Sequence, residues 1–137
     1  MKYEFIKNAT DDYTLKYKDK EFNFKSDINL TSKLQKAPKL ARIEMIKDLA
    51  DEGISLKKFT IEEKKDGKTY FDNTNKNELE NAYIENKQLE IVDNVCKEKF
   101  DKTLAELILD VDLNEREAEV FAKELGSYLT GNIPSGR

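Results

Sequence analysis

Between Glu78 and Val111 the chain contains neither glycine nor proline, and this stretch limits the choice of fold more than any other feature. Its apolar residues recur three and four positions apart, which is the spacing of one face of an α-helix. The apolar stripe changes phase near Asn86, so the pattern allows either one long bent helix or two helices. We therefore expect the second half of this 137-residue chain to be helical.

The first third of the chain alternates apolar and polar residues, which is the pattern of β-strands with one packed face. Tyr13, Leu15 and Tyr17 fall on one side of a strand, and Phe22 and Phe24 return after a short turn. This arrangement predicts a β-hairpin with an aromatic face toward the core and a lysine-rich face toward solvent.

Glycine and proline mark the boundaries of elements in the middle of the chain. The range 32–36 is typical of a short helical piece, and Pro38 is placed to restart the helix. Gly53 is typical of the left-handed residue that ends a helix, and Asp66-Gly67 is a turn sequence of a second β-hairpin. The inner stripe of this helix is predicted to consist of Leu40, Ile43, Ile46, Leu49 and Ala50.

The last helix has a recognisable start and one apolar face. Asn114 followed by Glu117 resembles a capping box, in which each residue satisfies a backbone N–H of the other. An amphipathic helix near the end of a chain can belong to the core or can dock onto another chain, and the sequence does not distinguish the two. As candidate protein-binding residues on this face we take Phe121, Leu125, Tyr128 and Leu129.

The order of these elements predicts an α+β fold. We expect a small antiparallel sheet of two β-hairpins packed by three to four helices, with a helical C-terminal half. The length suits a single domain over 1–131, followed by a flexible tail over 132–137. Neither a signal peptide nor a membrane-length apolar run is apparent, so we expect a cytoplasmic protein that does not contact membranes.

The composition disfavours most catalytic and metal chemistry. The chain has no histidine and a single cysteine. Histidine is the usual acid or base near neutral pH, and zinc and redox sites need clusters of cysteine and histidine. Cys96 has apolar neighbours at helical spacing and is interpreted as a small core residue. We therefore expect no enzymatic activity, no cofactor and no metal site.

The charge pattern disfavours nucleic acid as a partner. The 24 basic residues include only three arginines, and the net charge is -4 with both signs interleaved. Arginine is the usual residue for bidentate recognition of phosphates and bases. The doublets Lys57-Lys58 and Lys64-Lys65 lie near aromatic residues, as in proteins that bind single strands. Acidic residues interrupt them, so protection of a strand edge explains these lysines as well.

Two acidic patterns have simpler explanations than a metal site or a catalytic pair. Asp110, Asp112 and Asn114 look like the first ligands of a calcium loop, but Glu115 and Phe121 occupy the positions that need glycine and a bidentate glutamate. A joint between two helices explains these residues better.

The adjacent carboxylates Asp11-Asp12 and Glu62-Glu63 could in principle form an acid–base pair. Neighbouring residues of a strand point to opposite faces, so Glu62 and Glu63 cannot face one substrate together. Solvated surface is the expected role of both pairs.

The outline of the chain resembles a known group of proteins. It carries the strand segments Tyr13-Thr-Leu-Lys-Tyr17 and Glu21-Phe-Asn-Phe-Lys25, then becomes helical and ends near Glu117-Ala-Glu-Val-Phe-Ala-Lys-Glu-Leu-Gly126. In this order, and in its acidic, lysine-rich composition, it resembles the tail assembly chaperones of temperate phages of Gram-positive bacteria. The resemblance implies a non-enzymatic helper in the host cytoplasm that binds the tape-measure protein or tail-tube subunits until they assemble.

Two functional hypotheses follow. The first is a protein-binding assembly factor or chaperone that uses exposed apolar helix faces and can form homo-oligomers, with phage tail components as its clients if the resemblance holds. The second is an inhibitor encoded by a phage or mobile element, which binds a host defence or nucleic-acid enzyme through an acidic surface. A hydrolase that uses carboxylates alone is a residual third class.

Overall fold

The structure, a computed structural model, describes residues 2–132. Within them it has two antiparallel sheets and four α-helices, which confirms the predicted α+β class. The chain divides into two compact units: unit 1 is Met1–Lys33 with Glu90–Arg137, and unit 2 is Leu34–Leu89. The single domain over 1–131 stays a prediction. The elements are β1 (Glu4–Ala9), β2 (Asp12–Tyr17), β3 (Lys20–Lys25), α1 (Leu30–Asp51), the short 3-10 helix η1 (Leu56–Phe59), β4 (Ile61–Lys65), β5 (Lys68–Asp72), α2 (Thr74–Phe100), α3 (Leu104–Val111) and α4 (Glu115–Thr130).

The sheet of unit 1 has the strand order β1-β2-β3, and one of its faces is packed. Leu15 of β2 pairs with Phe5 of β1 and with Phe22 of β3, so apolar side chains line up across the three strands. Leu15 and Tyr17 are buried, while Lys16 between them is exposed. The predicted aromatic and lysine-bearing faces are therefore confirmed.

Helices pack on the aromatic face of this sheet. The ring of Phe100, at the end of α2, lies 5.0 Å from that of Phe24 on β3. The ring of Phe121 on α4 lies 4.9 Å from that of Tyr3 and 5.9 Å from that of Phe5. The core of unit 1 is thus an aromatic layer between the sheet and the helices.

The long glycine-free stretch forms two helices, and the break between them follows Phe100 rather than Asn86. Asp101 has a left-handed backbone with φ of 58°, which ends α2. Thr103 then caps α3, because its hydroxyl accepts the N–H of Glu106 while the Glu106 carboxylate accepts the N–H of Thr103. Local capping chemistry therefore decides where the helix breaks.

The joint between α3 and α4 matches the sequence prediction. Asp112 adopts a left-handed conformation with φ of 65° at the end of α3. Asn114 and Glu117 form the predicted capping box at the start of α4. Of the predicted tail over 132–137, Asn132 donates its N–H to the carbonyl of Ser127, and residues 133–137 lie outside the described part of the chain.

In unit 2, α1 is one helix that contains Pro38, so the separate helical piece predicted over 32–36 is wrong. A proline inside a helix removes one backbone hydrogen bond, and its ring meets the carbonyl four residues before it. Packing against other elements supplies most of the stability of helices in proteins, so it can outweigh this local cost. The helix ends as predicted at Gly53, where φ is 70°. The N–H groups of Gly53 and Ile54 return to the carbonyls of Ala50 and Leu49 at 3.0 and 2.8 Å.

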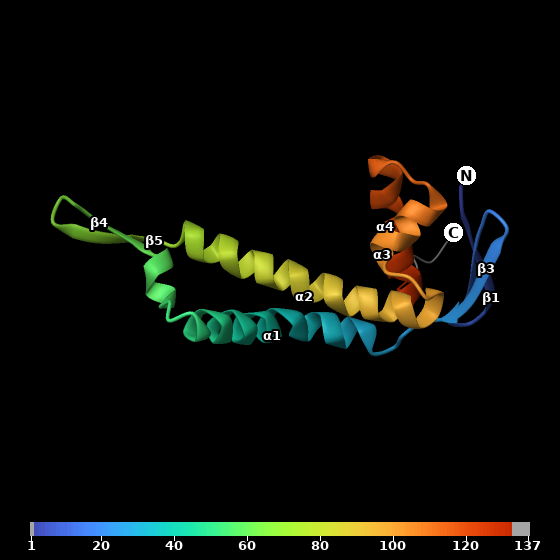
Figure 1. The fold of residues 1–137 in the computed structure, drawn as a ribbon, viewed down its shortest axis with the longest axis horizontal. Helices are drawn as coiled ribbons and strands as arrows, with labels where there is room; N and C mark the ends of the chain where they lie inside the picture. Colours follow the sequence, from blue (N-terminus) through green and yellow to red (C-terminus); the bar gives the residue numbers. More distant parts are fainter. Residues whose placement is uncertain (1, 133–137) are drawn as a thin grey trace. The chain divides into compact units, whose positions relative to one another are not determined.

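Within unit 2, α1 and α2 lie side by side, and the β4–β5 hairpin continues beyond their ends (Figure 1). Helix α2 begins at Thr74, earlier than the expected Glu78, because Asp72 accepts the backbone N–H and the hydroxyl of Thr74. The hairpin is a sheet of its own, so the two predicted hairpins do not share one sheet. Three side-chain pairs join the helices: Arg42–Glu80, Glu44–Lys87 and Asp48–Tyr83.

Candidate functional site

The docking face predicted on the last helix is wrong, because its residues form part of the core of unit 1. Phe121, Leu125 and Leu129 are at most 1% exposed. Tyr128 is half-buried, and its ring stacks on that of Phe5 with centroids 4.4 Å apart. The aromatic face of the sheet covers this side of α4, so another chain cannot dock on these residues while the unit is folded.

The residues that resemble a calcium loop have structural roles. The Asp110 carboxylate accepts hydrogen bonds from the Lys20 ammonium and the Tyr17 phenol, and these lower the pKa of Asp110 to about 2. Asp112 ends α3, and Asn114 caps α4. The structure therefore shows the joint between helices that we favoured from sequence.

Cys96 is fully buried in α2, as predicted. Burial, reinforced by the nearby Asp93 carboxylate, raises the pKa of the Cys96 thiol to about 12. A thiol with this pKa is protonated at neutral pH, and nucleophilic chemistry requires the thiolate.

The remaining charged patterns lie on the surface. Asp11 occupies the turn between β1 and β2 with φ of 59°. Glu62 pairs with Phe71 and Glu63 pairs with Tyr70 across the β4–β5 hairpin, so the two carboxylates point to opposite faces as expected. Of the basic doublets, 57–58 lies in η1 and 64–65 lies in β4.

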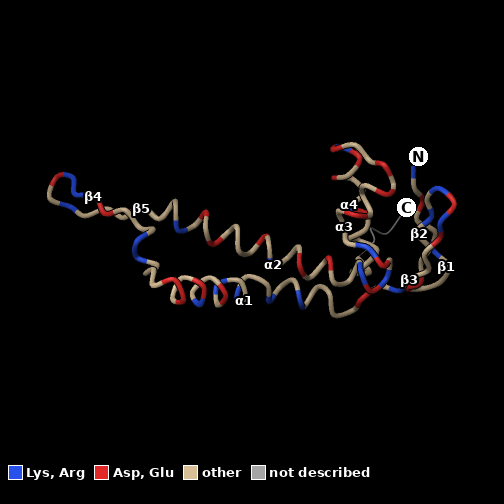
Figure 2. Tube along the Cα trace, in the orientation of Figure 1, with Lys and Arg blue, Asp and Glu red and all other residues tan. Residues whose placement is uncertain are grey.

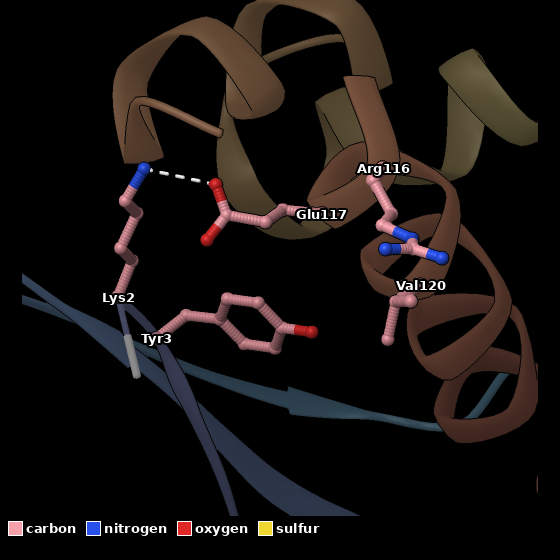
Figure 3. A pocket seen from close by; sticks show the side chains of 5 residues that line it. All are labelled: Lys2, Tyr3, Arg116, Glu117 and Val120. Atoms are coloured by element: carbon pink, nitrogen blue, oxygen red, sulfur yellow. Dashed lines mark hydrogen bonds and ion pairs between the residues drawn. The ribbon is translucent and has the colours of Figure 1, made fainter. Parts of the chain in front are cut away.

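A small pocket in unit 1 was not anticipated from sequence (Figure 3). Its volume is about 230 Å³, and the Lys2 ammonium at its rim donates to the Glu117 carboxylate at 2.9 Å. Tyr3 donates its hydroxyl to Glu124, and burial, followed by the Glu124 carboxylate, raises the pKa of Tyr3 to about 12. The pocket is smaller than typical ligand cavities, and these hydrogen bonds link the start of the chain to α4. The side chains that line it are Lys2, Tyr3, Arg116, Glu117 and Val120.

The predicted inner stripe of α1 is wrong, because most of its residues are exposed. Leu40, Ile43 and Ile46 are 47, 54 and 55% exposed, and Ala50 is also exposed. Of the predicted stripe, only Leu49 is buried. The residues that are buried instead recur every four positions and are Ala37, Ala41, Met45 and Leu49.

The burial of the spacing-four stripe of α1, instead of its large aliphatic stripe, has a physical reason. Two helices approach more closely where small residues meet, and the buried stripe of α1 contains Ala37 and Ala41.

Among residues 2–132, ten large apolar side chains are exposed, and seven of them lie in unit 2, the smaller unit. Leu40, Ile43 and Ile46 share one side of α1, and apolar residues that lie together in this way are typical of interaction surfaces.

The β4–β5 hairpin is the most exposed element of unit 2. Every residue of both strands faces solvent. Tyr70 and Phe71 are 52 and 64% exposed, and Ile61 is 45% exposed. At its base the Thr60 hydroxyl donates to the Asn73 side chain at 2.8 Å. The hairpin therefore presents apolar side chains on both of its faces.

The sequence contained a signal for each exposed surface. Tyr70 and Phe71 are adjacent in a strand, so they cannot both point toward one core. The large aliphatic residues of α1 recur every three positions, while a second stripe with spacing four runs along the same helix. One helix with two apolar stripes cannot bury both against a single neighbour.

Comparison with known proteins assigns the chain to no group. No protein-family model, curated protein or solved structure matches it. No helix within residues 2–132 has the length and apolar character to span a membrane.

Proposed function

We propose that this chain is a non-enzymatic, protein-binding assembly factor, and that the β4–β5 hairpin contacts its client protein. The observation that carries the proposal is the exposure of Tyr70 and Phe71, by 52 and 64%, on opposite faces of β5. Aromatic side chains supply a large contact area at a low entropy cost and are enriched among the residues that dominate binding energy.

The backbone of the hairpin supports the same proposal. Within the described residues β4 and β5 form a two-stranded sheet, so each strand has an outer edge without a neighbouring strand. An extended segment of a client can add to such an edge through main-chain hydrogen bonds. Lys64 and Lys65, together with Glu62 and Glu63, make unselective pairing of this edge unfavourable.

The non-enzymatic part of the proposal rests on the titratable groups. The raised pKa of Cys96 keeps its thiol protonated. Tyr3 and Asp110, whose pKa values also shift strongly, are engaged in hydrogen bonds between elements of unit 1. In each case the shift is explained by packing or by a structural hydrogen bond, and none requires a substrate.

The finer proposal follows the resemblance to phage tail assembly chaperones. In that case the client is a tape-measure protein or a tail-tube subunit, which the chain holds in the host cytoplasm until assembly. The alternative of an inhibitor with an acidic surface has less support. Six acidic side chains among the described residues form ion pairs with lysine or arginine.

The hairpin can be tested by replacing its two aromatic residues. Wild-type chain and the variant Y70S/F71S are immobilised and incubated with a lysate of the cells that produce the protein, and each retained protein is purified for measurement of its Kd. The matched control is L109S/V120S, which removes two exposed apolar side chains from unit 1. We expect Y70S/F71S to weaken binding at least about tenfold and the control to bind like wild type. Equal binding by all three chains would overturn the proposal.

A further inference from the structure

The two helices of unit 2 carry opposite charges on the sides that they turn away from each other. In the part of α1 that belongs to unit 2, 34–51, the residues within about 60° of Ile43 around the helix axis form a surface that we call the α1 outer face. All of its charged members are lysines, and its centre is aliphatic. It consists of the exposed residues Lys36, Lys39, Leu40, Ile43, Ile46, Lys47 and Ala50.

The corresponding surface of α2 is acidic. Over the range 78–89 of α2, the residues within about 60° of Glu85 around the helix axis form the α2 outer face. Its charged members are both glutamates, and Leu89 is 50% exposed within it. Acidic positions recur along this part of α2 (Figure 2). The α2 outer face consists of the exposed residues Glu78, Asn81, Ala82, Glu85, Gln88 and Leu89.

The contact between the helices uses Arg42 of α1 with Glu80 of α2, and it also uses acidic groups of α1 and a basic group of α2. The Glu44 carboxylate of α1 pairs with the Lys87 ammonium of α2. The Asp48 carboxylate accepts a hydrogen bond from the Tyr83 phenol at 2.9 Å. The internal contact therefore occupies these acidic groups of α1 and this basic group of α2, and each outer face is left with a single sign.

We infer that the α1 outer face of one copy of this chain binds the α2 outer face of a second copy. In this contact Ile43 and its aliphatic neighbours meet Leu89 and Ala82, while lysines at the rim meet Glu78 and Glu85. The two faces also match in extent, because residues 36–50 and 78–89 rise by roughly 21 Å and 17 Å along their helices.

Charge disfavours the symmetric alternative, in which two α1 outer faces pair with each other. An antiparallel contact centred on Ile43 would place Lys39 of one copy against Lys47 of the other. Like charges at an interface oppose binding. The acidic α2 outer face is therefore the better partner.

A contact between two different faces does not close on itself. When two copies bind in this way, one of them keeps an unused α1 outer face and the other keeps an unused α2 outer face. Further copies can bind at these two ends, so the copies form a row or close into a ring. The β4–β5 hairpin takes no part in this contact. The inference thus goes beyond the proposed client binding and depends on other residues.

Charge reversal tests the inference on the full chain. The mass of wild-type protein is measured by light scattering over a range of concentrations at low and high salt. We expect the mass to rise with concentration and the rise to weaken in high salt, because the rim contacts are screened.

Two variants reverse the charge of one outer face. In K36E/K39E/K47E both outer faces are acidic, and in E78K/E85K both are basic, so each variant alone should remain monomeric. Mixed in equal amounts, the two variants have complementary faces and should associate again.

Two further variants make the result specific. The control K7E/K25E/K123E changes the net charge as much as the α1 variant but lies in unit 1, so it should associate like wild type. I43D places a charge at the centre of the α1 outer face and should remain monomeric with an unchanged circular dichroism spectrum, because Ile43 is 54% exposed. Monomeric wild-type protein at every concentration would overturn the inference. So would undiminished association of E78K/E85K, or a mixture that stays monomeric.

Discussion

The phenol of Tyr17 donates a hydrogen bond to the Asp110 carboxylate at 2.6 Å, and this bond joins β2 to α3. The same oxygen accepts the Lys20 ammonium at 2.7 Å. These two donors, with Lys20 the stronger, lower the pKa of Asp110 to about 2. A carboxylate at the start of an apparent calcium loop is therefore a structural acceptor that ties the sheet to the helices.

This lowered pKa predicts how stability depends on pH. The unfolded chain titrates Asp110 near its ordinary value of about 3.9, whereas the folded chain holds it near 2. The contribution of the carboxylate is therefore complete above about pH 5 and is lost as the pH falls toward 2. We expect wild type to be more stable than Asp110→Asn in urea unfolding at pH 6, and the difference to shrink steadily between pH 5 and pH 2.

Tyr17→Phe is the matched variant for this measurement. It keeps the buried ring, which is 2% exposed, and removes the hydroxyl alone. One donor to the carboxylate is lost, so we expect the free energy of unfolding to fall by about 1 kcal/mol at neutral pH. The dependence on acid should become shallower, because the folded-state pKa of Asp110 rises toward its ordinary value. A constant difference between wild type and Asp110→Asn at all pH values would contradict this account.

The two corrected apolar stripes predict losses of stability of very different size on substitution by alanine. Phe121 is fully buried in unit 1, so Phe121→Ala should lower the free energy of unfolding by about 3–5 kcal/mol. Ile43 is 54% exposed, so Ile43→Ala should lower it by less than about 1 kcal/mol. Urea unfolding followed by circular dichroism at low protein concentration measures both. Similar losses for the two variants would show that the assignment of faces is wrong.

The features that sequence predicted well are those set by local chemistry. Asn114 and Glu117 form the expected capping box, and Gly53 ends α1 in the expected left-handed conformation. Alternation in β2 and β3 placed the aromatic face of the sheet correctly. Each of these depends on residues within a few positions of one another, so the sequence contains the whole cause.

The features that sequence missed depend on which neighbour an element meets. Both stripes of α1 have helical spacing, and only the contact with α2 selects Ala41 and Met45 over Ile43 for burial. The apolar face of α4 likewise has the same pattern whether a sheet or another protein covers it. Aromatic contacts such as Phe5 with Tyr128 assign it to the core, and a sequence pattern does not specify that pairing.

Two glycines should respond to alanine with opposite signs. Gly67 has φ of 73° in the β4–β5 turn, a conformation that a Cβ disfavours although there is open space around it. Gly67→Ala should destabilise the hairpin by about 1–2 kcal/mol. Gly126 lies within α4 with an ordinary backbone and open space for a Cβ, so Gly126→Ala should stabilise unit 1 by about 0.5–1 kcal/mol.

Amide hydrogen exchange resolves these two effects. With Gly67→Ala, the amides of β4 and β5 should exchange faster while those of β2 keep their protection. With Gly126→Ala, protection should rise in α4 and remain unchanged in the hairpin. Slower exchange in the hairpin of Gly67→Ala would rule out the left-handed turn that the structure shows.

The single thiol should report the opening of unit 1. Cys96 is fully buried, and its pKa is raised to about 12, so at pH 8 almost none of this thiol is ionised, against roughly a quarter of ordinary cysteines. We expect a thiol-specific disulfide reagent to label the native chain at least about a hundredfold more slowly than the chain unfolded in urea. The labelling rate should rise with urea in parallel with the loss of near-ultraviolet circular dichroism from the aromatic layer.

Two variants test whether labelling depends on the core of unit 1. Phe121→Ala should accelerate labelling at low urea, while Ile43→Ala should not, because only the first weakens the core that contains the thiol. Rapid labelling of the wild-type chain without urea would mean that this end of α2 is not packed as the structure describes.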